Sequence, residues 1–202
     1  MYARVVTGQY QSAGKLDEAF QMYRDSIIPA ARQTQGFKGA LGLVDRGAGK
    51  AIAINLRETA ADMQATETSG FLQEQFAKIA HLLVGTPTIE VYEVSIQEMQ
   101  QGVEGTYARV LTTTVQPGKM DEGMQIVRDS VLPAARQQPG FKGGFWMSDR
   151  SMGKIMAITL WATEADLLAG ETSGYYQAQI AKVAHVLATP VVREAYEVAL
   201  LV

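Results

Sequence analysis

Hydrophobic and polar residues change their period several times along the first hundred positions of the chain. Residues 2–9 alternate between apolar and polar, which predicts a strand. Residues 15–34 carry an apolar stripe with spacings of four, three and four, as one face of a helix requires: Leu16, Phe20, Tyr23 and Ile27. Pro29 lies inside this stretch and lacks a backbone donor. We therefore expect the helix to kink or restart there.

The next segments predict a hairpin, a second helix and a last strand. Residues 39–46 and 50–57 read as two strands joined by a turn at Gly47 to Gly49. Thr59 and Asp62 form a capping box with Asp in place of Glu, which predicts a helix start. The stripe of this helix is Leu72, Phe76, Ile79 and Leu83. We expect Gly70 to divide the helix, and residues 88–96 to form the last strand.

The whole pattern then occurs a second time. Tyr2-Ala3-Arg4-Val5 returns as Tyr107-Ala108-Arg109-Val110, and residues 24–33 return almost unchanged 104 positions later as residues 128–137. The repeat is about a hundred residues long, the size of a domain, so it indicates a tandem duplication and not a solenoid. We predict a domain over residues 1–98, a polar linker over 99–105 and a second domain over 106–202.

The order of elements in each repeat defines the predicted fold. It is β-α-β-β-α-β, the ferredoxin-like arrangement of the α+β class. Four strands with helices on one side leave the other face of the sheet bare and apolar. We therefore expect the two sheets to pack face to face as an α+β barrel, a pseudo-dimer within one chain. Further self-association remains open.

Composition and charge exclude several classes of function. The chain has 202 residues, 18 Lys and Arg, 21 Asp and Glu, two His and no Cys. The absence of a basic excess argues against a nucleic-acid partner, and the absence of cysteine excludes thiol catalysis and Cys-rich metal sites. No apolar run reaches the roughly 20 residues of a membrane helix. We expect no membrane association and a cytoplasmic location.

Candidate binding residues gather on one face of the third strand in each repeat. This face carries Ala53, Asn55 and Arg57 in the first repeat and Ala157, Thr159 and Trp161 in the second. Small and polar side chains together provide the room and the hydrogen bonds that a pocket needs. In the second strand Gly42 stands against Trp146, and in the first strand Arg4 and Arg109 interrupt the apolar alternation. Alternation alone leaves open whether this face looks toward the helices or toward the other sheet.

Each candidate also has a structural interpretation. Arg4 and Arg109 bind an anionic substrate, or each pairs with a carboxylate such as Glu93 or Glu197 across the sheet. Trp146 and Trp161 form an aromatic wall or fill the core. His81 and His185 are general bases, or cations that favour the end of a helix. Tyr175 and Tyr176 add hydroxyl groups to a site, or only pack.

Four motifs resemble the antibiotic biosynthesis monooxygenase domain, a member of the dimeric α+β barrel superfamily. They are the first strand followed by Gly-Lys-x-Asp-Glu at 118–122, Pro-Gly-Phe-Lys-Gly at 139–143, Asp149-Arg150, and the third strand that runs from Leu160 through Trp161 to Asp166. The resemblance covers both repeats. It implies a substrate pocket between sheet and helices in each domain. Members of the family include cofactor-free oxygenases of aromatic polyketides, heme-degrading oxygenases and proteins without known activity.

The family's functional residues are mostly absent at the matching positions. Heme-degrading members use an Asn, a Trp and a His; the residues here are Thr7 and Thr112, Thr66 and Gly170, and Phe76 and Ile180. We therefore expect no heme degradation, no metal centre and no cofactor. The polyketide oxygenases use an Asn four residues before the Trp of the third strand and a Tyr six residues after it. Only Trp161 matches, with Ala157 and Leu167 at the other two positions and Ala53, Arg57 and Met63 in the first repeat.

The resemblance implies an oxidoreductase that oxidises a small phenol- or anthrone-like aromatic molecule without metal or flavin. The alternative is a ligand-binding or structural barrel without turnover. The candidate substrate-binding residues are Arg109, Trp146, Trp161, Tyr175, Tyr176, His185, Asn55 and Arg57. Because the repeats differ at these positions, we expect an open, polar site in the first repeat and a flat, aromatic, partly filled site in the second.

Overall fold

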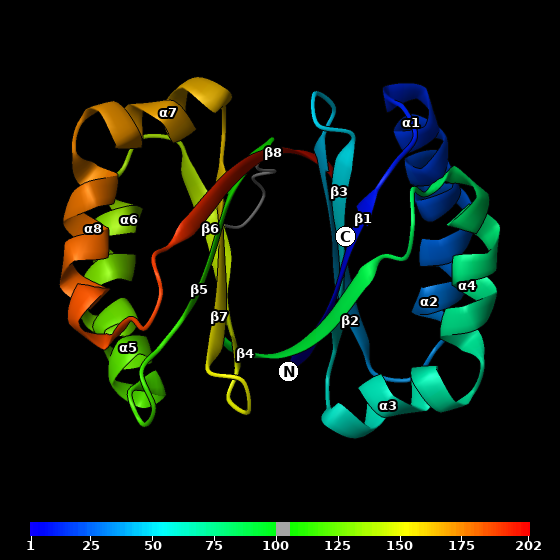
Figure 1. Ribbon diagram of the computed structural model, residues 1–202, viewed down its shortest axis with the longest axis horizontal. Coiled ribbons are helices and arrows are strands. Elements are labelled where there is room, and N and C mark those ends of the chain that lie inside the picture. The colour runs from blue at the N-terminus through cyan, green and yellow to red at the C-terminus, as the bar shows by residue number, and fades with distance from the viewer. Residues whose placement is uncertain (100–105) are drawn as a thin grey trace. The chain divides into compact units, whose positions relative to one another are not determined.

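The computed structural model describes residues 1–99 and 106–202 and contains the predicted order of elements twice (Figure 1). The strands of the first repeat are β1 (Tyr2–Gln9), β2 (Phe37–Asp45), β3 (Lys50–Arg57) and β4 (Thr88–Met99). Its helices are α1 (Ala13–Met22), α2 (Ile28–Arg32), α3 (Ala60–Thr68) and α4 (Phe71–Ile79), with a π-helical segment at Tyr23–Ile27 and a 3-10 turn at Ala80–Leu82.

The second repeat has the same elements. Its strands are β5 (Tyr107–Thr114), β6 (Phe141–Asp149), β7 (Lys154–Trp161) and β8 (Val192–Leu201). Its helices are α5 (Met120–Ile126), α6 (Leu132–Arg136), α7 (Glu164–Thr172) and α8 (Tyr175–Val183), with a π-helical segment at Val127–Val131 and a 3-10 turn at Ala184–Val186.

The predicted interruption of the first helix takes the form of a π-helical segment. Tyr23–Ile27 is π-helical, and Pro29 follows at the start of α2. Proline has no N–H to donate, and its ring crowds the carbonyl of the residue four positions earlier. A wider turn before Pro29 relieves this crowding, and the second repeat uses the same device before Pro133.

The predicted capping signals of the second helix are confirmed. The Thr59 hydroxyl accepts a hydrogen bond from the Asp62 amide at 3.1 Å, and the Asp62 carboxylate accepts one from the Thr59 amide at 3.2 Å. Gly70 separates α3 from α4 with φ of 80°, a left-handed conformation that glycine adopts without strain. Both signals come from local chemistry, which is why the sequence alone could predict them.

The chain forms two compact units, and their limits differ from those of the repeats. Unit 1 contains residues 1–92 and 197–202, and unit 2 contains residues 93–196. Residues 197–201 of β8 pair with β2 in unit 1, and residues 93–99 of β4 pair with β6 in unit 2. Met99, the first residue of the predicted linker, ends β4, and the rest of the linker lies outside the described residues.

The strands within each unit pair antiparallel, with β3 between β1 and β2 in unit 1 and β7 between β5 and β6 in unit 2. The hydrogen-bonded order of the strands is β1-β3-β2-β8-β5-β7-β6-β4, the order of a closed barrel, and it confirms the predicted α+β fold class. The packing of the two sheets on one another stays a prediction.

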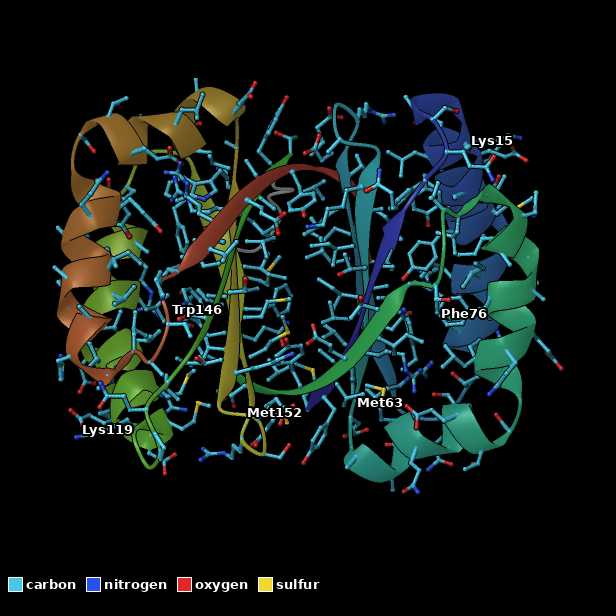
Figure 2. The ribbon with its side chains drawn as sticks, viewed as in Figure 1. Lys15, Met63, Phe76, Lys119, Trp146 and Met152 are labelled. Atoms are coloured by element: carbon cyan, nitrogen blue, oxygen red, sulfur yellow. The ribbon has the colours of Figure 1, made fainter. Side chains whose placement is uncertain are left out.

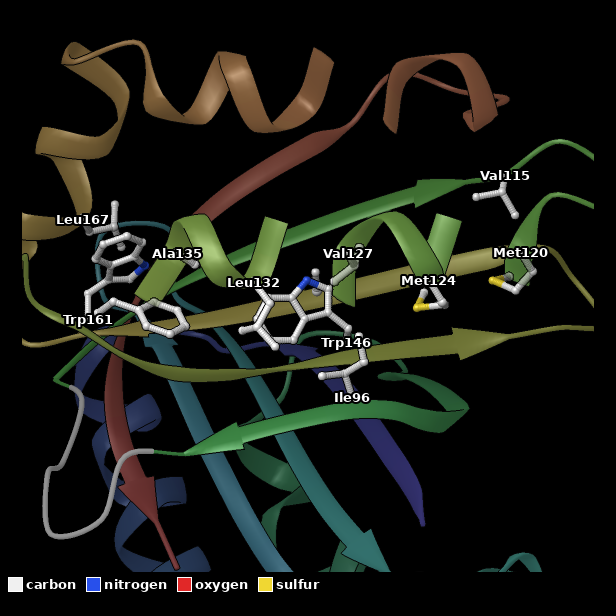
Figure 3. Packing of buried hydrophobic residues seen from close by; sticks show 12 residues of the cluster. Ile96, Val115, Met120, Met124, Val127, Leu132, Ala135, Trp146, Trp161 and Leu167 are labelled. Atoms are coloured by element: carbon white, nitrogen blue, oxygen red, sulfur yellow. The ribbon is translucent and has the colours of Figure 1, made fainter. Parts of the chain in front are cut away.

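In each unit the helices cover one face of the sheet (Figure 1). Between the sheet and the helices of unit 2 lies a cluster of buried apolar side chains that includes both tryptophans (Figure 3). Trp146 is 3% exposed and Trp161 is 1% exposed. The two tryptophans of the second repeat therefore belong to the space between its sheet and its helices.

Candidate ligand-binding site

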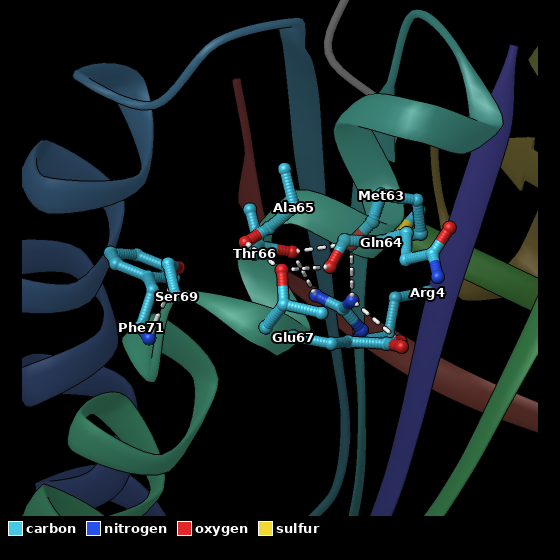
Figure 4. A network of polar contacts seen from close by, with 9 residues as sticks. Arg4, Met63, Gln64, Ala65, Thr66, Glu67, Ser69 and Phe71 are labelled. Atoms are coloured by element: carbon cyan, nitrogen blue, oxygen red, sulfur yellow. Dashed lines mark hydrogen bonds and ion pairs between the residues drawn. The ribbon is translucent and has the colours of Figure 1, made fainter.

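The contacts of Arg4, the buried arginine of β1, show which side of the sheet its polar face is turned to. Arg4 donates hydrogen bonds to the Thr66 hydroxyl at 3.0 Å, to the Met63 carbonyl at 3.0 Å and to the Glu67 carboxylate at 2.9 Å (Figure 4). All three acceptors belong to α3. Since Arg4 pairs with Asn55 across β1 and β3, the face that carries Arg4 and Asn55 looks toward the helices.

Arg109 of unit 2 also points toward the helices and donates its hydrogen bonds to the matching helix, α7. Its Nη2 donates to the Leu167 carbonyl and to the Glu171 carboxylate, at 3.4 Å from the latter, and both residues are in α7. Each arginine pairs with a carboxylate, as its structural interpretation predicted, but the suggested partners Glu93 and Glu197 were wrong. Glu93 contacts Arg150 and Glu197 contacts Arg46, so these carboxylates serve hairpin arginines, which also bind Asp121 and Asp17.

One substitution between the repeats leaves Arg109 with fewer partners than Arg4. The residue that matches Thr66 is Gly170, which has no hydroxyl. A Cβ at Gly170 would lie 3.7 Å from Nη2 and 3.9 Å from Nη1 of Arg109, so a side chain here would reach the guanidinium. Both hydrogen bonds of Arg109 to the described residues are made by Nη2. Among the described residues, its Nη1 group therefore has no hydrogen-bond partner, and its buried Nε has none either.

Arg109 lines a cavity of about 100 Å³ in unit 2. Four aromatic side chains also line this cavity: Trp146, Trp161, Tyr175 and Tyr176. Trp146 projects from β6 on the sheet side (Figure 2). One water-sized group takes roughly 10–15 Å³ of such space, so the cavity holds about eight of them, the scale of a one- or two-ring molecule.

The cationic group of this cavity lies between aromatic rings. The Arg109 guanidinium carbon is 5.3 Å from the centre of the Trp161 ring and 5.4 Å from that of Tyr176. Arg193 lies 5.3 Å from the centre of the same Tyr176 ring, and Glu171 binds both arginines. Cations over aromatic faces are held by the ring quadrupole. The stack fixes the Arg109 side chain at the edge of the cavity.

Burial controls the protonation of the groups that line this cavity. Desolvation lowers the pKa of Arg109, but a guanidinium in a protein stays protonated at neutral pH. Burial raises the pKa of Tyr175 to about 12 and also raises that of Tyr176, so both phenols keep their protons. The described residues that line the cavity therefore present one positive charge and no negative charge.

Unit 1 has a cavity of about 70 Å³ in the corresponding place. Its lining also includes four aromatic residues, Tyr10, Phe20, Tyr23 and Phe76, and its polar groups include Asn55 and Gln75. Figure 2 shows Phe76 on α4, on the helix side of this cavity. The aromatic lining expected of the second site is present, but the expectation of a more open, polar first site was wrong, because the first cavity is the smaller one and is also aromatic.

Two of the predicted site residues do not line either cavity. The guanidinium of Arg57 binds the Thr34 hydroxyl and the Gln35 carbonyl and lies over Phe37, with its side chain 1% exposed. His185 is exposed and contacts Glu122 at 3.1 Å. The other six predicted residues line the cavities, five in unit 2 and Asn55 in unit 1. Whether any of them binds substrate stays a prediction.

The residues in these cavities do not suit heme. No imidazole lines either cavity, and among residues 1–99 and 106–202 no group of three or more carboxylates and imidazoles is placed to hold a metal ion. The absence of heme chemistry stays a prediction. Within the same described ranges no helix is long and apolar enough to cross a membrane.

Sequence reasoning missed four residues that shape the sites. Glu171 and Arg193 hold the stack around Arg109, Gly170 leaves one side of Arg109 unfilled, and Tyr23 brings a phenol into the cavity of unit 1. Glu67 and Glu171 occupy matching positions in the repeats, which was a readable signal. Gly170 could also have been found from the sequence, because the arginine is kept between the repeats while Thr66, with its hydroxyl, is replaced by Gly170.

Comparison with known proteins places the chain in a family. No model of a known protein family matches it. The uncharacterized protein Rv2557 of Mycobacterium tuberculosis is 31% identical over 162 residues, which are 78% of this chain and 69% of that protein. The chain belongs to the family of Rv2557. That name says nothing about activity, so the family leaves the function open.

Solved structures show that the fold is shared along the whole chain. An anthrone oxidase-like protein has a TM-score of 0.73 at 12% identity, covering 100% of this chain and 92% of that one. A ferredoxin fold protein from Listeria monocytogenes, related to antibiotic biosynthesis monooxygenases, has a TM-score of 0.56 at 10% identity, covering 98% and 95%. The heme-degrading enzyme LmHde from the same organism has a TM-score of 0.57 at 10% identity, covering 98% and 99%. The resemblance to this superfamily is confirmed for the fold.

Proposed function

We propose that unit 2 binds a small planar phenol as its anion and allows dioxygen to oxidise it without metal or flavin. The observation that carries the proposal is the pairing of an aromatic-lined cavity with Arg109, whose Nη1 group has no hydrogen bond to the described residues. A phenolate satisfies that donor with its oxygen while its ring lies against Trp146 and Trp161.

The charge on Arg109 determines which form of the substrate binds. In a desolvated cavity a cation strongly favours an anion over the neutral phenol, so it lowers the pKa of the bound hydroxyl. Among the residues that the structure describes, no carboxylate or imidazole lines the cavity. The substrate proton therefore passes to solvent as the anion forms, and Arg109 plays the part of a preorganised donor to the oxyanion.

For 1-naphthol the chemistry balances with dioxygen alone. The naphtholate transfers one electron to dioxygen, and the two radicals combine to form a carbon–oxygen bond at the carbon para to the naphtholate oxygen. Loss of water from the resulting hydroperoxide leaves a carbonyl, so one oxygen atom enters the product and the other leaves as water. The protein contributes a dry cavity, an aromatic wall and the cation of Arg109. The likeness of the fold to an anthrone oxidase-like protein supports this class of reaction.

The second candidate is a binding protein without turnover. The absence of a carboxylate or imidazole from the lining of the unit 2 cavity favours it, since proton transfer by a positioned side chain is a common source of rate enhancement. The two candidates predict the same ligand and differ only in oxygen consumption.

Tryptophan fluorescence provides a direct test, because the chain has only two tryptophans and both line the unit 2 cavity. We expect 1-naphthol to quench this fluorescence and to consume one dioxygen per molecule. Replacing Arg109→Met should weaken naphthol binding by about tenfold to a hundredfold, the worth of a hydrogen bond to a charged group.

Arg57→Met is the matched control, because Arg57 lines neither cavity and should leave naphthol binding unchanged. Binding without oxygen uptake would leave the second candidate as the function. Absence of quenching by naphthol in the unmodified protein would rule out both.

A further inference from the structure

The cavity of unit 1 contains a buried hydroxyl group whose proton is donated to no acceptor among the described residues. The Asn55 amide donates to the Tyr23 hydroxyl oxygen at 3.0 Å, and both side chains line the cavity. Tyr23 is 7% exposed and donates to no acceptor among the described residues. Buried polar groups in proteins are nearly always hydrogen-bonded. The acceptor for the Tyr23 proton therefore has to come from within the cavity.

The described residues that line this cavity carry no formal charge. They include no Lys, Arg, Asp, Glu or His. The two buried arginines of unit 1 have partners elsewhere, Arg4 on α3 and Arg57 at Thr34 and Gln35. Burial also raises the pKa of Tyr23, which keeps its hydroxyl neutral and able to donate. An anion would lose its hydration here without gaining a cation, so charged ligands are disfavoured.

The second repeat lacks the same pair. Val127 stands at the position of Tyr23 and Thr159 at the position of Asn55. The Thr159 hydroxyl accepts a hydrogen bond from the Trp161 indole at 3.0 Å. The donor of unit 1 therefore has no counterpart in unit 2, and the two cavities differ in the ligand chemistry that they favour.

We infer that the cavity of unit 1 is a separate binding site for a small uncharged molecule with one carbonyl group, which accepts the Tyr23 proton. The apolar part of the ligand lies against Phe20, Phe76 and Ile79, which line the same cavity. At roughly 10–15 Å³ for each water-sized group, a volume of about 70 Å³ holds about five or six such groups, the size of one small ring. This site does not depend on the function proposed for unit 2.

Two probes of the same shape test the inference. Cyclohexanone carries the carbonyl oxygen, and methylenecyclohexane has a carbon in its place. Binding to the full-length chain is followed through the methyl carbon signals of Ile27 and Leu83, which line the cavity. We expect cyclohexanone to bind about threefold to tenfold more tightly, as one net hydrogen bond provides. Equal binding would overturn the inference, because it would mean that water satisfies Tyr23.

Tyr23→Phe removes only the hydroxyl and should abolish the preference for cyclohexanone. Asn55→Thr, which installs the residue of the second repeat, should reduce it and serves as the test if Tyr23→Phe does not fold. Thr159→Val changes the matching position of unit 2 and should leave the preference intact. A preference that persists in both unit 1 variants, or that is lost in Thr159→Val, would show that the site is wrongly placed.

Discussion

In unit 1 the aromatic residues that line the cavity are Tyr10, Phe20, Tyr23 and Phe76, and in unit 2 they are Trp146, Trp161, Tyr175 and Tyr176. None of these positions matches between the repeats. In unit 1 none of the four belongs to a main strand of the sheet, whereas in unit 2 two of them come from β6 and β7. Aromatic volume has therefore been exchanged between opposite walls of the same kind of cavity.

Gly42 and Trp146 show the physical reason for this exchange. A Cβ at Gly42 would lie 2.4 Å from the Phe20 ring, so β2 can carry no side chain where α1 supplies a phenyl group. In unit 2, Met124 replaces Phe20 and Trp146 replaces Gly42. Close packing permits one large group at this level of each cavity, from the sheet or from the helix. The absence of an aromatic residue at Gly42 is thus compensated by Phe20 on the facing helix.

The largest expected effect concerns the matched residues Arg57 and Trp161. Trp161→Ala should lower the free energy of unfolding by about 3–5 kcal/mol, because it removes a fully buried ring and leaves a cavity. Arg57→Met keeps most of the buried volume and should cost about 1–3 kcal/mol, from the unpaired Thr34 and Gln35 groups. Urea unfolding measures both. Equal losses would mean that the two positions support their units in the same way.

The compensation at Gly42 can be broken and restored. Gly42→Ala should destabilise the protein by about 1–3 kcal/mol, because the new methyl group overlaps the Phe20 ring. Adding Phe20→Met should recover most of this loss, since the flexible methionine side chain can move away from the new methyl group. Met124 leaves room for Trp146 in the same way in unit 2. A double-mutant cycle measures the coupling. Additive effects of the two changes would contradict the proposed exchange.

The arginine networks differ by one hydroxyl, and reciprocal changes test its role. Thr66→Ala should cost about 1 kcal/mol, because the Nη1 group of Arg4 loses its acceptor. Gly170→Thr should bring a hydroxyl to Arg109, raise stability by several tenths of a kcal/mol and weaken 1-naphthol binding. The Cβ would be 3.4 Å from Tyr175, a close but tolerable contact. Stronger naphthol binding in Gly170→Thr would show that Arg109 does not hold the anion.

The smallest expected effect is on tyrosine ionisation. Burial raises the pKa of Tyr10 and of Tyr175 to about 12, above the usual value near 10. A phenol whose pKa is raised in the folded state contributes to the free energy of unfolding. This contribution is complete below pH 10 and is lost as the pH rises toward 12. Absorbance at alkaline pH should therefore show a late-titrating class of tyrosines. Tyr175→Phe should remove part of this class, and an unchanged late class would contradict the burial of that hydroxyl.

Local signals explain why most elements were predictable. Pro29, the Thr59–Asp62 cap and Gly70 act within a few residues of themselves, and the structure confirms a boundary at each. The repeat then transferred each prediction to the second half of the chain. The compact units were not predictable in this way, because the ends of β4 and β8 pair with strands far away in the sequence.

The candidate site was predictable in its residue types and not in its geometry. The sequence alone determined that Arg4 and Arg109 repeat and that the tryptophans occur only in the second half. It also determined that Asn55 shares one face of its strand with Ala53 and Arg57. Alternation along a strand fixes which side chains share a face, but helices packed from distant sequence decide which face they cover. Only the tertiary structure therefore placed Arg109 beside Gly170 and turned Arg57 toward Thr34, since these contacts join residues that no local pattern relates.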